Sequence, residues 1–560
     1  MLDPSPPAPV REIYDAMFAP LLFGPLSLLA PLITNTWTLC RVLSAMQGAL
    51  SFSAVALGVI ALTRSPTAAM LFPGFYVPMS LSWLGHNYQM HFLPTAAAAG
   101  NIAFYLTLGT VGLLVLDKLR IAGVLLGLLP LFHPTLGLLG WLLAACLIAA
   151  RGREWRVAAK TLVPWWAPCA TVSMVLLARN GIGSAPLSDQ GRRALESFMD
   201  LWCNHRRPLD RGALVQDILM MMLLAGIAHR ARGLPEDHRL RIWAIGLLLF
   251  LAALIPYLFV FQTLHPEWAP LILRRMLLNR WANITCVLLP LTLYGWLWLR
   301  STRDRDPAST VGLAFFAALC SLSSYRAMAL VNSALGTLGV PKLPTPQATT
   351  AVAIALGWMA LVELARSFAR TRAVSTRISN ELSAAATKPG EKCGLGGRAQ
   401  TITLGIAIAL IAWPTLRLAG RIKLNPEAPP MLSRVLPESA LVQGVILSPG
   451  HCLEFAIPLK KPILCVVHDA LPYVPHSIDV HERLLRDIYG LEIKNPLAPQ
   501  RWKFPDIHRK ALWESRDTQD WTALAEQWEF HNVIVPRGWS MRLPGPALDV
   551  GPDFQLYPIR

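Results

Sequence analysis

The chain has 560 residues, of which 54% are hydrophobic and 15% charged, and its mean hydropathy is +0.42. This composition is far from that of a soluble enzyme or a disordered chain, and it indicates a membrane protein. The net charge is +17, but the basic residues lie between apolar segments and not along one face or tail, so nucleic acid is not an expected partner. Membrane lipid is.

The N-terminal region predicts an interfacial segment. Residues 20–36 form an apolar run that is broken by Pro20, Pro25 and Pro31. Proline interrupts a helix, and we therefore expect this run to lie in or dip into the outer interface of the membrane. Residues 1–10 lack the basic start and apolar core of a secretory signal peptide, so insertion is expected to depend on the first spans.

Ten apolar stretches have the length of membrane spans. About 20 apolar residues of helix cross a hydrocarbon core roughly 30 Å thick. The predicted spans are 43–63, 67–84, 96–116, 158–178, 212–229, 242–261, 282–299, 309–326, 348–366 and 401–419. The fold class is therefore predicted to be mainly α, a polytopic transmembrane bundle.

Residues 121–150 predict a hairpin instead of a span. The run is interrupted by Pro130 and by His133-Pro134, and basic residues flank both of its ends. Two short helices that return to the same membrane face explain this pattern. The tip, His133-Pro134-Thr135, is then expected to point toward the outer half of the membrane.

The arginine-rich loops predict the orientation. Basic residues are dense at 151–160, 230–241, 300–305 and 366–377, and the positive-inside rule makes these loops cytoplasmic. The alternate loops and the chain after residue 420 then face outward. The glycine-rich and alanine-rich stretch at about 367–400 is expected to be a flexible cytoplasmic loop.

After residue 420 the sequence has the pattern of a small α/β domain. Short β-branched runs at 442–447, 462–467 and 532–535 alternate with helical patterns at 479–489 and 518–529. The predicted domains are therefore a transmembrane helical domain, 1–420, and a periplasmic α/β domain, 421–560. Cys452 and Cys465 both lie in the tail, and sequence does not decide whether they are bridged.

The outward loops hold the polar candidates for a binding site. They are His86, His91, His205, Arg206, Arg207, Arg274, Arg275 and Arg280, together with His133 at the hairpin tip. Guanidinium groups suit a phosphate, and apolar helix flanks suit a lipid chain. Two plainer interpretations stay open: the arginines anchor the interface, and His133 is a structural hydrogen-bonding group.

The sequence gives little support for a metal site or a transport path. His86 and His91 are five residues apart, which is not the spacing of a helical metal-binding pair. Embedded acids are scarce, Asp217 and Glu363 being the exceptions, whereas proton-coupled transport needs ionisable groups near the membrane centre. A transporter is therefore the third hypothesis.

Several motifs in order resemble a known family. They are FHPTLGLL at 132–139, FMDLWCNHRRPLD at 198–210, LILRRMLLNRWANI at 271–284, KKPILCVVHDALPY at 460–473, HERLLRDIYG at 481–490 and NVIVPRGW at 532–539. With the layout of spans, hairpin and outward tail, the chain resembles the GT-C superfamily of polyprenyl-phosphate-sugar glycosyltransferases. Within that architecture it resembles a group of bacterial multipass proteins.

The resemblance implies transfer of a sugar from a polyprenyl-phosphate carrier on the outer face of the bacterial inner membrane. It also implies a catalytic acid, commonly aspartate, in the first outer loop after the first span. Asp15 is the candidate here although no helix precedes it, and Asp200 and Asp210 are the alternatives. Whether a divalent metal, Mg²⁺ or Mn²⁺, takes part stays open, as does the oligomeric state. A non-catalytic scaffold of an envelope machine is the second hypothesis.

Overall fold

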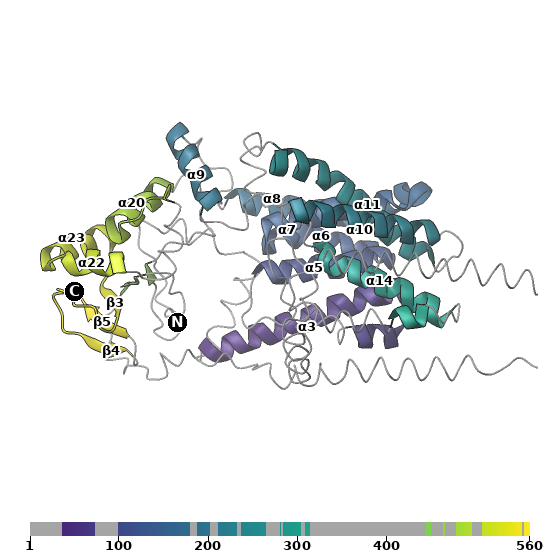
Figure 1. Cartoon of the computed structure of the whole chain (residues 1–560). Helices are drawn as coiled ribbons and strands as arrows, with labels where there is room; N and C mark the ends of the chain where they lie inside the picture. Colours follow the sequence, from purple (N-terminus) through teal and green to yellow (C-terminus); the bar gives the residue numbers. More distant parts are fainter. Residues whose placement is uncertain are drawn as a thin grey trace, which may run out of the picture.

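The structure is a computed structural model of the whole chain. It describes residues 36–72, 99–179, 188–201, 211–231, 237–264, 281, 284–303, 309–313, 444–449, 463–464, 478–495, 507–550 and 554–559. Most of these residues are helical, and a five-stranded sheet lies near the C-terminus. Figure 1 shows the helices of the first half side by side and the sheet apart from them.

The helices of the bundle lie at predicted spans and, for two of them, at the predicted hairpin. They are α3 (Thr36–Thr63), α5 (Ala99–Val115), α6 (Leu119–Phe132), α7 (Pro134–Ala149), α8 (Trp155–Arg179), α10 (Arg211–Arg230), α11 (Asp237–Tyr257), continued by the π-helix η4 (Leu258–Leu264), and α14 (Thr285–Thr302). Within the described residues, three helices are long and apolar enough to cross a membrane: Ala45–Thr63, Gly152–Ala178 and His238–Phe261.

The full count of ten spans stays a prediction. The predicted spans at 348–366 and 401–419 lie outside the described residues, as do most of 67–84 and 309–326. The same is true of the interfacial segment at 20–36, except for its last residue, and of the loop at 367–400. What the described residues establish is the coarser statement, a mainly helical chain with three helices long and apolar enough to cross a membrane.

Large aromatic residues fill the bundle core, and two of them pair their polar atoms inside it. The indole Nε1 of Trp243 on α11 donates to the Thr292 hydroxyl of α14 at 2.8 Å. The Tyr294 hydroxyl donates to the carbonyl of Ala68 at 3.1 Å. Both aromatic side chains are fully buried. Such pairs satisfy the polar groups inside the bundle itself, which a helix in lipid needs because lipid offers no hydrogen bonds.

Helices α6 and α7 form the predicted hairpin. They meet at His133, and close approaches pair Gly137 with Pro130 and Gly140 with Leu129. The indole of Trp141 donates to the Leu126 carbonyl at 2.7 Å. As residue numbers rise on one helix they fall on the other, so the two helices run antiparallel. The hairpin prediction is confirmed.

Glycine sets the contact between α6 and α8. A Cβ at Gly123 would lie 2.8 Å from the Leu162 carbonyl oxygen, and one at Gly127 would lie 2.4 Å from the Cys169 Cβ. The two glycines are four residues apart on one face of α6, as in the small-residue motifs of membrane helices. The Ser173 hydroxyl donates to the Gly127 carbonyl at 2.6 Å across this contact. The opposite side of α8 is apolar and exposed at Val157, Val172 and Val175, as a lipid-facing surface is.

The tail domain is a small α/β fold. Its strands are β1 (Ile446–Leu447), β2 (Ile463–Leu464), β3 (Asn532–Pro536), β4 (Leu548–Val550) and β5 (Phe554–Pro558), in the order β2-β1-β3-β5-β4. β1 is parallel to β2 and β3, and β5 is antiparallel to β3 and β4. The helices are α20 (Ile478–Tyr489), α22 (Ile507–Ser515) and α23 (Thr518–Trp528). The three predicted strands and two predicted helices are confirmed.

Arg516 connects two of the tail helices. Its guanidinium donates to the carbonyls of Ile488, at 3.0 Å, and of Asp487, at the C-terminal end of α20. The same group lies 5.2 Å from the ring centroid of Trp521 on α23. Burial lowers the pKa of Arg516, while the carboxylates of Asp520 and Asp487 oppose that shift. A cation at a helix C-terminus is the favourable placement for the helix dipole.

One helix of the tail core comes from a distant part of the chain. Helix α9 (Asp189–Leu201) buries Ala194, Leu195, Phe198 and Met199 in the same hydrophobic cluster as α20 and β3. The Phe198 ring meets the buried imidazole of His481 edge to face, with centroids 5.8 Å apart. Figure 1 shows α9 between the bundle and α20. The domain boundary near residue 420 stays a prediction, but this core draws on residues from both sides of it.

Candidate functional site

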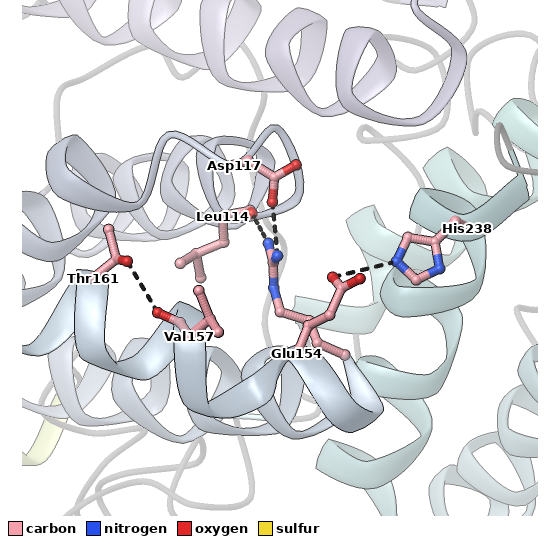
Figure 2. Close-up of polar contacts among 7 residues, drawn as sticks. Leu114, Asp117, Glu154, Val157, Thr161 and His238 are labelled. Carbon is pink, nitrogen blue, oxygen red and sulfur yellow. Dashed lines mark hydrogen bonds and ion pairs between the residues drawn. The ribbon is translucent and has the colours of Figure 1, made fainter.

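The termini of several bundle helices gather at one end of the bundle, which we call the arginine end. Arg151, at the turn between α7 and α8, donates to the Asp117 carboxylate at 2.7 Å and to the Leu114 carbonyl at 2.5 Å. Glu154 lies 4.0 Å from His238 at the start of α11. Figure 2 shows Asp117 and Leu114 together, with Glu154 directed toward His238.

Other helix ends join this group. Arg300 near the end of α14 donates to the carbonyl of Arg230 at the end of α10, at 3.2 Å. Arg64, Arg239 and Arg303 line one cleft. Three of the four loops predicted to be cytoplasmic, at 151–160, 230–241 and 300–305, therefore begin or end at the arginine end. The fourth, 366–377, lies outside the described residues.

The opposite end of the bundle carries the hairpin tip, and we call it the tip end. Because α8, α10 and α14 each have one terminus at the arginine end and are 25, 20 and 18 residues long, their other termini lie roughly 27–37 Å away, at 1.5 Å per residue. These termini are Arg179, Arg211 and Thr285. The polar segment between α8 and α10 and the one before α14 are thus flanked by helix termini at the tip end.

Most of the predicted site residues lie outside the described residues. They are Asp15, His86, His91, His205, Arg206, Arg207, Asp210, Arg274, Arg275 and Arg280, with Cys452 and Cys465 of the tail. Of the predicted catalytic acids, Asp200 alone falls within a described element, the last turn of α9. In the chain, the candidates from His205 to Asp210 stand between α9 and α10, and those from Arg274 to Arg280 stand between η4 and α14.

His133 is the one predicted site residue whose side chain is described. It is the N-cap of α7, where its Nδ1 accepts from the Leu136 amide at 3.4 Å, and Pro134 follows at the first helical position. Its Cδ2 and Nε2 lie against Gly100 at the start of α5. His133 is thus a hydrogen-bonding group, in agreement with the structural interpretation, and its substrate-binding role stays a prediction. Its imidazole nevertheless stays half-buried at the tip end.

A buried carboxylate stands out on α10. Asp217 is fully buried, six residues from the start of that helix at the tip end, and it is the only fully buried carboxylate among the described residues. An ionisable side chain inside a membrane helix is costly and is a default candidate for function. The sequence drew attention to Asp217 as an embedded acid but did not predict its complete burial.

An apolar groove of about 880 Å³ runs between α7 and α8. Trp141 and Trp166, which meet edge to face at 5.2 Å, line one part of it, and Ala149 and Trp155 line the part near the arginine end. Its lining suits a hydrocarbon chain. It reaches toward the arginine end and away from the hairpin tip.

The described residues contain no group of three or more His, Cys, Asp or Glu side chains that could hold a metal ion. Comparison with family models, with curated proteins and with solved structures gives no match to this chain. The resemblance to the GT-C superfamily therefore enters below as a proposal.

Proposed function

We propose that the chain is an integral membrane protein of the GT-C kind, which transfers a sugar from a polyprenyl-phosphate carrier at its tip end. In this proposal the membrane is the bacterial inner membrane, the tip end and the tail are periplasmic, and the product belongs to an envelope polysaccharide or glycolipid. The resemblance of the motifs in order along the chain is what suggests the chemistry.

The single observation that carries the proposal is the common position of the helix termini that flank the polar candidates along the chain. The helix termini that flank the segments of Asp210, His205 and the three arginines are those at the tip end, opposite to the arginine end. The hairpin cap His133 and the buried Asp217 belong to the same end. A phosphate, a sugar and an acceptor would meet such groups at the membrane surface, where a polyprenyl carrier presents its headgroup.

The proposed mechanism assigns roles by chemistry. An aspartate, Asp15 or else Asp200 or Asp210, removes the proton from the acceptor hydroxyl as that oxygen attacks the sugar carbon bonded to the carrier phosphate. The bond from that carbon to the phosphate oxygen breaks, and Arg274, Arg275 and Arg280 stabilise the negative charge on the departing phosphate. His205, Arg206, Arg207, His86 and His91 bind the substrate in this account.

The test is binding and turnover of labelled polyprenyl-phosphate sugars by the purified full chain in lipid nanodiscs. The double substitution Arg274→Gln/Arg275→Gln is expected to weaken binding by at least about tenfold, since hydrogen bonds to a charged partner are each worth roughly 1.5–3 kcal/mol. A matched control is Arg153→Gln/Arg156→Gln, which removes the same charge at the arginine end and should change binding by less than about twofold.

Measurements of turnover identify which of the three candidate acids is the base. Asparagine at the true base should lower turnover about 10²-fold to 10⁴-fold while carrier binding persists. If no polyprenyl-phosphate sugar binds the folded protein, or if both arginine pairs behave alike, the transferase proposal is wrong.

A second candidate, a non-catalytic scaffold, is favoured by α9. This helix belongs to the tail core through Phe198 and Leu195, so the tail is tied to the bundle by two separate stretches of chain. A scaffold that presents its tail to a partner needs such a tie. If the chain is a scaffold, substitution of the three candidate acids by asparagine leaves its cellular function intact. Disruption of the contact between α9 and the tail core abolishes that function.

A further inference from the structure

A cleft at the arginine end gathers three guanidinium groups from three elements. Its volume is about 230 Å³, and Arg64 follows α3, Arg239 lies in the first turn of α11 and Arg303 ends α14. Leu62 and Leu299, both buried, form an apolar wall, and Thr63 and Thr302 complete the lining. The cleft lies at the opposite end from the proposed transfer site.

Two of the arginines that line this cleft, Arg64 and Arg239, hold like charges close together. Arg239 interacts electrostatically with Arg64 and Arg151 as like charges and with Asp117 as an opposite charge. Asp117, however, is already paired with Arg151 at 2.7 Å. No carboxylate lines the cleft among the residues that the structure describes. Like charges held together beside an apolar wall are stabilised by a bound anion.

The backbone at Arg64 supports a role for its side chain. Its φ is +54°, in the left-handed region, where side chains other than those of Gly, Asn and Asp are uncommon. The Arg64 amide closes α3 by donating to the Ile60 carbonyl at 2.9 Å, and the Ser65 hydroxyl accepts from the Ala68 amide at 3.1 Å at the start of helix 66–72. Glycine would serve this turn at lower conformational cost. An arginine in this conformation points to a function for the guanidinium.

We infer that this cleft binds the phosphate group of an anionic ligand through Arg64 and Arg239. Guanidinium groups form paired hydrogen bonds with phosphate oxygens, and the side chains of both arginines line the cleft. The volume is below the roughly 300–1,000 Å³ of sites for drug-sized ligands, so the cleft itself holds the phosphate group and little more of its ligand. Two sources carry this chemistry: the headgroup of an anionic phospholipid in the leaflet at the arginine end, and a soluble phosphorylated molecule on that side.

The test uses the purified full chain and a substitution that removes the charge without straining the turn. Arg64→Gly deletes the guanidinium and suits the positive φ, so its melting temperature without ligand should equal or exceed that of the wild type. Arg239→Gln is the second variant, and Arg156→Gln, which does not line the cleft, is the matched control.

Two arms distinguish the sources. Inorganic phosphate is titrated against thermal stability at constant ionic strength with chloride as reference, and retained lipid is measured by native mass spectrometry after reconstitution in phosphatidylglycerol or phosphatidylcholine. We expect phosphate affinity or phosphatidylglycerol retention to fall by at least about tenfold in Arg64→Gly and Arg239→Gln, but not in Arg156→Gln.

A loss in the phosphate arm identifies a soluble ligand, and a loss confined to the lipid arm identifies a headgroup. If wild type, Arg64→Gly and Arg239→Gln are equal in both arms, or if Arg156→Gln loses as much as they do, the inference is overturned. Because no polyprenyl-phosphate sugar is used, its failure does not bear on the transferase proposal.

Discussion

The helical bundle and the tail domain use apolar side chains differently. In the bundle, large apolar residues such as Phe52, Met174 and Val172 are exposed, and the closest helix contacts occur at glycines such as Gly127. In the tail, α20 buries its apolar face, including Leu484 and Ile488, and leaves Asp479, Arg483 and Arg486 exposed. Lipid tails are as apolar as leucine side chains, so burial of apolar surface does not drive helices together in a membrane. In water, by contrast, burial of apolar surface is the main driving force of folding. Backbone approach and internal polar pairs should therefore matter most in the bundle.

Removal of one aromatic ring tests the tail first, because it should have the largest effect. Phe198→Ala deletes a fully buried ring of α9 and its edge-to-face contact with His481, and should cost about 3–5 kcal/mol of tail stability. Denaturant unfolding, followed by the fluorescence of the tail tryptophans, measures this. Met174→Ala on the lipid-facing side of α8 is the control and should cost less than about 1 kcal/mol. Equal costs would remove the distinction between the two regions.

A single methyl group tests the bundle. A Cβ at Gly127 would lie 2.4 Å from the Cys169 Cβ and 2.7 Å from the Trp166 carbonyl oxygen, so Gly127→Ala must push α6 away from α8. We expect a loss of about 2–3 kcal/mol and a lower melting temperature in detergent. Gly109→Ala is the same chemical change with an ordinary 3.6 Å contact to the Ala54 Cβ, and it should be tolerated. A Gly127→Ala protein as stable as Gly109→Ala would refute close α6–α8 packing.

The ion pair at the arginine end comes next. Arg151 is buried, its partner Asp117 is more than half exposed at 58%, and the Leu114 carbonyl accepts a second bond. Arg151→Ala should cost about 2 kcal/mol, because it removes a charged donor from both groups. Asp117→Asn should cost about 1 kcal/mol or less, since asparagine tolerates the φ of +62° at that position and the lost pair is partly exposed. Thermal unfolding of both variants in one detergent gives the ranking, and the reverse order would contradict it.

The smallest expected effect is at a helix cap of the tail. Asp517 accepts from the Asp520 amide at 2.9 Å, and the Asp520 carboxylate accepts from the Asp517 amide at 3.1 Å. Asp517→Ala should cost about 1 kcal/mol, and Asp517→Asn, which keeps an acceptor oxygen, should restore most of it. Denaturant midpoints of the two variants decide the matter. No difference between alanine and asparagine would mean that the cap contributes nothing.

Much of the fold was predictable from the sequence, because the periodicity of apolar residues and the positions of prolines are local signals. Pro130 and His133-Pro134 predicted the hairpin, and the β-branched runs predicted β1, β2 and β3. The apolar face of α9 was missed, since its charged residues Arg192, Arg193 and Glu196 suggested a polar loop. The spacing of Ala194, Leu195, Phe198 and Met199 was the signal that could have revealed it. β4, β5 and α22 were also missed, being short and mixed in composition.

The candidate site was predictable only as a set of chain positions. The arginine pattern predicted which loops meet, and Arg151, Arg230 and Arg300 do meet at one end. The cleft of Arg64, Arg239 and Arg303 could not be anticipated, because its three arginines stand more than 60 residues apart along the chain and only packing brings them together. Likewise, the cap role of His133 depends on the helix that follows it, whereas its place at the tip follows from Pro134 alone.

The central claim is that the arginine end and the tail lie on opposite faces of the membrane. Single cysteines at Arg153, in the turn before α8, and at Ala523, on the exposed side of α23, test this most directly in a background without the native cysteines. A membrane-impermeant thiol reagent is applied to sealed right-side-out vesicles. We predict that Ala523→Cys is labelled at once, whereas Arg153→Cys is labelled only after the vesicles are opened. Labelling of both, or of neither, in sealed vesicles would contradict the account.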